Sequence, residues 1–179
     1  CRMKEYVLPA IRNMKDLEKL IKTDYKICVL LDMHIGHLKS VMALLKANQI
    51  ETYIHIDLIK GMAVDEFACE YIIQTYNPKG IVSTKSKVIQ KAKSLNKLTI
   101  FRVFIIDSQA LSRSINLIKK VEPDFVEVLP GIAHKVVKII DEETPSKVIA
   151  GGLINEESEI VQALDSGASY VTTSNRLLW

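Results

Sequence analysis

Short apolar runs rich in β-branched residues alternate along this chain with amphipathic segments of helical length. This rhythm predicts a parallel sheet built from βα units, because each strand must return to the same edge of the sheet through a helix. Strand cores such as Ile27–Leu31 and Val103–Ile106 are apolar throughout, as expected where helices cover one face and a barrel interior the other. A half-exposed antiparallel sheet does not fit this pattern.

The predicted fold class is α/β, a TIM-barrel-like parallel (β/α) barrel with about seven βα units. A complete barrel has about eight units, so we expect closure to be partial or to be supplied by another element. A doubly wound open sheet is the structural alternative. We expect a single barrel domain over residues 1–179, with an N-terminal helical segment at about 6–25 followed by the βα units; the sequence does not fix whether this segment caps one end of the barrel. The predicted strands are Ile27–Leu31, Thr52–Asp57, Gly80–Ser83, Thr99–Ile106, Asp124–Leu129, Lys147–Ala150 and Ser169–Thr172.

Composition narrows the class of protein. The chain is 48% hydrophobic and 25% charged, which is ordinary for a globular protein, and no run approaches the ~20 apolar residues of a membrane span. The net charge of +3 permits RNA as a partner without demanding it. Three cysteines without a CxxC spacing, and an N-terminus unlike a signal peptide, predict a cytoplasmic protein.

Polar residues stand near the ends of several predicted strands, where βα barrels bind their ligands. Two-residue alternation places His55 and Asp57 on one face of their strand. We predict that the charged residues of this set converge on one polar ligand. An internal ion-pair network of Asp57, Arg102 and Glu127 is the alternative, and a structural role for His55 is an equally good interpretation. The predicted polar contacts to the ligand are Asp57, Lys60, Lys85, Arg102 and Glu127.

The last two predicted units carry the sharper signal. Gly151 and Gly152 follow the sixth predicted strand, and Thr173 and Ser174 follow the seventh. Glycine permits close backbone approach, and N–H groups at a helix start attract anions, so we predict a phosphate site at Gly151, Gly152, Thr173 and Ser174. The alternative is that the two glycines only make a tight turn.

Other motifs are missing from the sequence. It contains no Walker motif, no GxGxxG fingerprint and no zinc spacing, so we expect no cofactor and no metal, even at His34 and His37 near Asp32. No catalytic set is identified, because neither Ser83 nor Ser174 has a recognisable base.

Lysines cluster after the third predicted strand, on a predicted helix. They are candidate contacts to RNA phosphates, with a solvated helix face as the alternative. Lys119 and Lys120 form another small cluster. The candidate RNA-binding residues are Lys85, Lys87, Lys91 and Lys93.

Taken together, these motifs resemble the glycerol-3-phosphate-responsive antiterminator family, also called glycerol uptake operon antiterminators. The similarity runs from about residue 8 to Trp179, in one order. It is carried by Leu8–Arg12, Tyr53–Gly61, Gly80–Lys85, Arg102–Ser108, Glu127–Ile132, Ile149–Ile154, Thr172–Ser174 and Leu178–Trp179.

The resemblance implies a non-catalytic bacterial cytoplasmic regulator that senses glycerol 3-phosphate and binds the leader mRNA of glycerol-utilisation operons, preventing premature transcription termination. Gly151, Gly152, Thr173 and Ser174 would then hold the phosphate, with Lys60, Lys85 or Arg102 as cationic support. Asp57 and Glu127 would accept hydrogen bonds from the glycerol hydroxyls.

Two other functions stay open at the level of the sequence. One is an enzyme acting on a small phosphorylated metabolite, in which Asp57 and Glu127 serve as acid and base and Lys60 or Lys85 as an amine. The other is a metabolite sensor that acts through a protein partner. The sequence also leaves the oligomeric state open.

Overall fold

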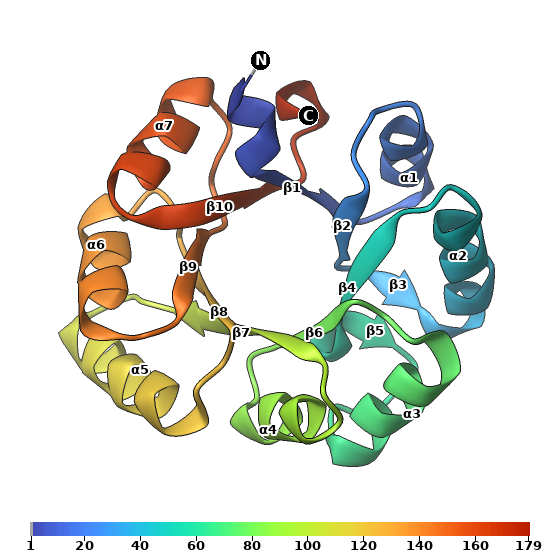
Figure 1. Cartoon of the computed structure of the whole chain (residues 1–179), viewed down its shortest axis with the longest axis horizontal. Helices are drawn as coiled ribbons and strands as arrows, with labels where there is room; N and C mark the ends of the chain where they lie inside the picture. The colour runs from blue at the N-terminus through green and yellow to red at the C-terminus, as the bar shows by residue number, and fades with distance from the viewer. Residues whose placement is uncertain (1) are drawn as a thin grey trace.

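The computed structural model describes residues 2–179, which form a closed parallel barrel of eight strands in the order β1-β10-β9-β8-β7-β6-β4-β2 (Figure 1). The barrel strands are β1 Val7–Ile11, β2 Ile27–Leu30, β4 Glu51–His55, β6 Gly80–Ser83, β7 Leu98–Phe104, β8 Phe125–Leu129, β9 Lys147–Ala150 and β10 Ala168–Thr173. The surrounding helices are α1 Met14–Ile21, α2 Ile35–Ala47, α3 Glu66–Tyr76, α4 Ser86–Ser94, α5 Ser108–Val121, α6 His134–Glu143 and α7 Glu157–Asp165.

The closed barrel confirms the predicted fold class and excludes the open sheet. All seven predicted strands are present, with ends that differ from the prediction by at most two residues. Short 3-10 helices, η1 Arg2–Tyr6 and η3 Arg176–Leu178, lie between α7 and α1, where an eighth helix would stand (Figure 1). A minor sheet of β3 Met33–His34 and β5 Ile59–Lys60 and the 3-10 helix η2 Ile56–Leu58 complete the elements. Every helix within residues 2–179 is too short or too polar to cross a lipid bilayer.

The prediction of a helical segment at about 6–25 is wrong in its first half. Residues 7–11 form β1, which pairs with β10 on one side and β2 on the other and thereby closes the barrel. Pro9 donates no backbone hydrogen bond and is unusual in a central strand. Here Pro9 lies opposite Thr173, and the strand is buried along its whole length, so tertiary pairing outweighs the local signal.

An Asn or Asp side chain caps the first turn of several helices that follow strands. Asn13, Asp65 and Asp107 each accept a hydrogen bond from a backbone N–H in the first turn of α1, α3 and α5. Such caps satisfy N–H groups that lack a partner within the helix. They hold the turns at the carboxyl ends of the strands, which form the face of the barrel described below.

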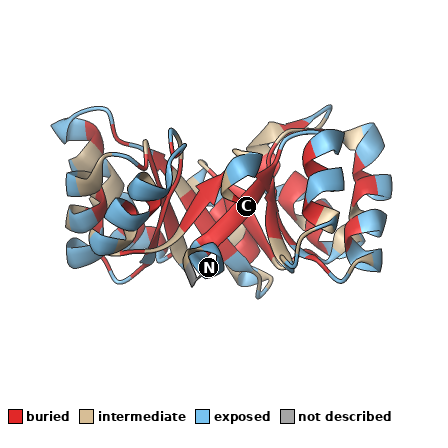
Figure 2. Ribbon diagram, turned by 90° about the horizontal axis from the view of Figure 1, so that it is seen from above, coloured by how far each residue is buried: buried red, intermediate tan, exposed pale blue. Residues whose placement is uncertain are grey.

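Two apolar layers hold the barrel together. The larger layer lies between the strands and the helices, whose outer faces are exposed (Figure 2). The smaller layer fills the inside of the barrel with alternate residues of the strands, as the two-residue period requires. Its buried members are Leu8, Ala10, Val29, Leu31, Tyr53, Val82, Ile100 and Ile149.

Closure by β1 is testable with Ile11→Ala. The Ile11 side chain is fully buried in the larger layer, so its truncation leaves a cavity and should lower the free energy of unfolding by about 3 kcal/mol. Leu177→Ala is the matched control, since Leu177 is 92% exposed and its truncation should change stability by less than about 0.5 kcal/mol. Urea unfolding measures both; equal effects would contradict the role of β1.

Candidate functional site

A polar cavity of about 400 Å³ opens at the carboxyl ends of the barrel strands. Its wall combines residues of the barrel interior with the loops that follow β9 and β10. Within the described part of the chain, the charged residues of the wall are Arg12, Arg102 and Glu127, without a lysine. The other wall residues are Ala10, Val29, Leu31, Gly152, Leu153, Ile154, Asn155, Thr172, Thr173, Ser174 and Asn175.

Arg12 stands directly after β1 and is held in place from two sides. Its NH1 group donates to Asp32 at 2.7 Å, and its Nε donates to Ser174 Oγ at 3.0 Å. The backbone N–H of Arg12 donates to the buried carboxylate of Asp16 at 2.8 Å. An arginine has five donors, so these contacts orient the guanidinium and leave NH2 without a protein acceptor among residues 2–179.

Beneath the cavity, Arg102 joins two buried side chains. Its NH1 group lies 3.0 Å from His55 Nε2, and its Nε lies 3.3 Å from Glu127 Oε1. The second contact is an ion pair, because the Nε–H does not point at the carboxylate. The other carboxylate oxygen of Glu127 accepts from the Thr172 hydroxyl at 2.7 Å. Arg102 and Glu127 thus meet as neighbours across β7 and β8, as their register requires.

The electrostatics fix the state of His55. Burial, followed by the Arg102 guanidinium, lowers the pKa of His55 to about 4, so the imidazole is neutral near pH 7. An arginine only donates, so Nε2 is the acceptor and the proton sits on Nδ1. Burial raises the pKa of Glu127, and the nearby Arg102 and the Thr172 hydroxyl oppose this shift.

Gly151 leaves the space that the Glu127 carboxylate occupies. A Cβ on Gly151 would overlap Glu127 Oε2 and stand 2.5 Å from Thr172 Oγ1. No side chain larger than hydrogen fits without displacing this carboxylate. The predicted role of Gly151 in close backbone approach remains a prediction, and the contact in the structure is with Glu127.

The loop after β9 presents backbone donors at the cavity. Gly152 and Leu153 both have positive φ, +80° and +61°, a conformation that a glycine adopts without strain. In residues 2–179 the N–H groups of Gly152, Leu153 and Ser174 find no protein acceptor. Unpaired N–H groups favour an anion, whereas Arg12 and Arg102 are each already paired with a carboxylate.

Thr173 is engaged within the protein. Its hydroxyl donates to Ile154 O at 3.1 Å and accepts from the Asn175 N–H at 3.0 Å. It therefore ties the loop after β9 to the loop after β10. The cavity wall brings together Arg102, Glu127, Gly152, Thr173 and Ser174 of the predicted residues.

Three predicted contacts lie outside the cavity wall. The Asp57 carboxylate accepts hydrogen bonds from Ser83 Oγ and from the Thr84 N–H and hydroxyl; burial raises its pKa, but these bonds outweigh burial and leave the pKa lowered. Lys60 is exposed in β5, and Lys85 is exposed at the start of α4. Asp57 is therefore bonded to Ser83 and Thr84 and does not take part in the ion pair of Arg102 with Glu127.

The predicted RNA-binding lysines divide into two groups. Lys91 pairs with Glu70 at 3.5 Å, and Lys93 donates to the carbonyl oxygens of Val121 and Glu122 at the end of α5. Lys85 and Lys87 are exposed. Two of the four predicted lysines, Lys91 and Lys93, are thus bonded to other groups of the protein.

Asp32 and His34 each have a protein partner, and the His37 ring lies near the ring of His34. Asp32 pairs with Arg12, and His34 Nδ1 accepts from the Gly36 N–H at 2.9 Å. The rings of His34 and His37 are 5.8 Å apart between centroids. The Asp32 carboxylate and the Nδ1 atom of His34 are therefore already bonded to other groups of the protein.

The sequence interpretation missed Arg12 and Thr172 in the wall. The predicted N-terminal helix includes Arg12, although Leu8, Ala10 and Arg12 follow the two-residue period of a strand whose inner face is the barrel interior. The same period along β10 points Tyr170, Thr172 and Ser174 inward. The two-residue alternation of inward-facing side chains in β1 and β10 is the sequence signal that could have identified Arg12 and Thr172 as wall residues.

Fold and cavity define the class: a closed (β/α) barrel with a polar cavity at the carboxyl ends of its strands, lined by two arginines and by the loops after β9 and β10. The chain belongs to the glycerol-3-phosphate responsive antiterminator family, whose model matches residues 7–179. This confirms the resemblance drawn from the motifs.

Solved structures agree with this assignment. The glycerol uptake operon antiterminator regulatory protein of Listeria monocytogenes str. 4b F2365 is 38% identical, with a TM-score of 0.95 over 98% of this chain and 95% of that one. A glycerol uptake operon antiterminator-related protein of Thermotoga maritima MSB8 is 30% identical, with a TM-score of 0.85 over 97% and 96%.

A curated relative and more distant structures complete the comparison. The uncharacterized protein YgcP of Escherichia coli (strain K12) is 26% identical over 173 residues, 97% of this chain and 91% of that one. The deoxyribose phosphate aldolase of Aeropyrum pernix, at 15% identity and a TM-score of 0.74 over 98% and 88%, shares the fold alone.

The state of His55 predicts a pH dependence of stability. Its folded pKa, about 4, lies below the ordinary 6.5, so the unfolded chain binds the proton first as the pH falls. The free energy of unfolding should therefore decrease from pH 6.5 toward pH 4, by roughly 3 kcal/mol in total. His55→Gln keeps an acceptor for Arg102 and should lack this part of the decrease.

Urea titrations of both proteins at several pH values measure the difference. Glu127 contributes with the opposite sign, since its pKa is raised, but it does so in both proteins and cancels. Parallel pH profiles for the two proteins would contradict a neutral, buried His55.

The Arg102–Glu127 pair makes a second prediction. Glu127→Gln leaves the Arg102 guanidinium buried without a counterion and should lower the free energy of unfolding by about 3 kcal/mol, and Arg102→Met in the same chain should restore part of it. The matched control is Glu51→Gln, which breaks the more exposed Lys79–Glu51 pair and should cost less than about 1 kcal/mol. Chemical unfolding of these three variants and of Arg102→Met alone measures the coupling, and additive losses at Arg102 and Glu127 would contradict it.

Proposed function

We propose that this protein is a transcription antiterminator that binds glycerol 3-phosphate in the cavity after β9 and β10 and binds the leader mRNA of glycerol-utilisation operons. Membership of the family supports both halves. The observation that carries the effector half is the position of Arg12, whose guanidinium is fixed beside unpaired N–H groups at the edge of the cavity.

In this proposal the phosphate lies between Arg12, Ser174 and the loop at Gly152 and Leu153. Arginine and backbone N–H groups are strong donors to phosphate oxygens, and charge-assisted bonds are the stronger kind. Arg12 is held by Asp32 and Ser174 before any ligand arrives, which lowers the entropy that binding costs. Asp32 neutralises part of its charge, so the backbone donors matter for a dianion.

The glycerol hydroxyls face the inner wall of the cavity. Glu127 and Thr172 offer acceptors there, and Arg102 offers a donor. A ligand with a phosphate at one end and two hydroxyls at the other matches this division of the wall. In this proposal Asp57, Lys60 and Lys85 do not contact the effector.

The RNA half assigns the protein to the bacterial cytoplasm, where leader transcripts are made, and makes it a regulator rather than an enzyme. The cavity wall within residues 2–179 contains no lysine, so it lacks the amine expected for the aldolase type of chemistry on this fold. This observation favours effector binding over turnover.

Calorimetric titration of glycerol 3-phosphate tests the effector half. We expect saturable binding by the unmodified protein and roughly 10- to 100-fold weaker binding by Arg12→Gln, the loss expected for a charge-assisted contact. Arg113→Gln, the same change on the exposed face of α5, is the matched control and should bind normally. Absence of binding by the unmodified protein, or equal affinity in Arg12→Gln, would count against the proposed site.

A further inference from the structure

A groove of about 910 Å³ lies at the opposite end of the barrel from the cavity. It runs between α2 and α3 and reaches the turns before β4, β6 and β7, the amino ends of those strands. We name it the α2–α3 groove. Its wall is built by Lys39, Met42, Ala43, Lys46, Gln49, Ile50, Glu51, Thr52, Tyr71, Thr75, Tyr76, Asn77, Pro78, Lys79, Asn96, Lys97 and Leu98.

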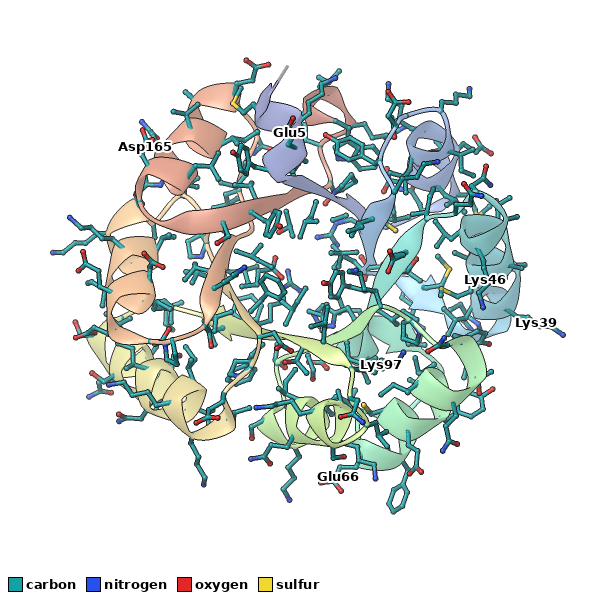
Figure 3. The ribbon with its side chains drawn as sticks, viewed as in Figure 1. Glu5, Lys39, Lys46, Glu66, Lys97 and Asp165 are labelled. Carbon is teal, nitrogen blue, oxygen red and sulfur yellow. The ribbon has the colours of Figure 1, made fainter. Side chains whose placement is uncertain are left out.

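The groove is basic. Four lysines and one glutamate line it, and the glutamate, Glu51, is paired with Lys79 at 3.1 Å. Lys39 and Lys46 lie two turns apart on one face of α2, both exposed, and have no acidic partner among residues 2–179. Figure 3 shows Lys39, Lys46 and Lys97 in the same sector of the molecule. The groove thus concentrates positive charge on a protein whose net charge is only +3.

Two aromatic rings lie beside these lysines. Tyr71 of α3 is 50% exposed, although a large hydrophobic side chain on a helix is ordinarily buried, and Tyr76 is partly buried in the same wall. Exposed rings within a basic groove stack with the bases of single-stranded nucleic acid while the lysines contact the phosphates. A base-paired duplex does not expose its base faces for such stacking.

The lysines on α4 are less suited to this role. Lys91 and Lys93 bind Glu70 and the end of α5, whereas Lys39 and Lys46 have no such contact within the described chain. The open wall beside Lys85 and Lys87 also carries the carboxylates of Asp65 and Glu66, which repel phosphate. Charge therefore favours the α2–α3 groove.

We infer that the α2–α3 groove binds a single-stranded segment of RNA, with backbone phosphates on Lys39 and Lys46 and a base stacked on Tyr71. This inference rests on the proposed function, which supplies the leader mRNA as partner. It goes beyond the proposed function in two ways: it names the surface that contacts the RNA, and it specifies that the bound RNA is single-stranded.

The test uses the full chain and a fluorescein-labelled transcript of a glycerol-uptake operon leader from the same bacterium, with fluorescence anisotropy at several salt concentrations. The double variant Lys39→Ala/Lys46→Ala should bind about tenfold more weakly, and its slope of log affinity against log salt should be smaller by about 0.7 per lysine. Lys135→Ala/Lys138→Ala is the matched control on the exposed face of α6 and should bind as the unmodified protein does.

Tyr71 separates stacking from charge. Tyr71→Ala should weaken binding about tenfold without changing the salt slope, and Tyr71→Phe should restore affinity, because the ring is retained. Titration of every variant with glycerol 3-phosphate verifies folding and the effector cavity.

The outcomes distinguish the two proposals. Weakening that is confined to the groove variants supports the inference. If the unmodified protein binds the transcript and the groove variants bind it equally well, or the α6 control is weakened as much as they are, the groove is overturned and the proposed function stands. If the unmodified protein binds glycerol 3-phosphate but not the transcript, the groove and the RNA half fail together, and the effector half is retained.

Discussion

The pairing of β1 with both β10 and β2 is the constraint on which the rest of the structure depends. A parallel barrel has no open edge only when its first and last strands meet. Here Val7–Pro9 lie opposite Val171–Thr173. The same strand pairing brings Arg12 next to Ser174, and the two side chains form a hydrogen bond although they are 162 positions apart in the sequence. Barrel closure and assembly of the cavity are therefore one event, and any change that loosens β1 removes a cation from the wall as well as apolar surface from the core.

The contact between Arg102 and Glu127 gives the inner wall of the cavity its polar groups. Removing Arg102 and Glu127 from water costs several kcal/mol each, which their mutual attraction, His55 and Thr172 together offset. Apolar residues would stabilise the interior at least as well. A pair of this kind retained at a cavity floor supplies donors and acceptors in fixed positions. Gly151 contributes by having no side chain where the carboxylate lies.

Local periodicity predicted most of the fold, and five of the nine predicted site residues lie in the cavity wall. Seven strands followed from their apolar runs, because a strand buried on both faces must be apolar throughout. β1 did not, because its five residues contain Pro9 and precede a helix, so a local interpretation joined them to that helix. Asp57 shares the period of the inward-facing residues, yet it lies in η2 beyond β4 and accepts from Ser83 and Thr84. Such contacts between neighbouring loops depend on backbone turns that residue spacing does not encode.

The cavity and the α2–α3 groove lie at opposite ends of the barrel but are connected through one stretch of chain. β4 begins at Glu51 in the groove wall and ends at His55 beneath the cavity, and the chain then continues through η2 and β5 to α3. Coupling between two ligands requires that each prefer one of two arrangements. The interior of the barrel is close-packed and does not deform gradually, so β4 itself is a poor moving part. α3 is a better one. Its 11 residues span about 16 Å as a rigid rod, from Asp65 at its cap to Tyr71 and Tyr76 in the groove. In residues 2–179 the one side-chain hydrogen bond that links the cavity wall to the segment between His55 and Asp65 joins Arg102 to His55. Under the proposed function, a movement of His55 passed along the chain to Asp65 would reach the groove at its aromatic wall.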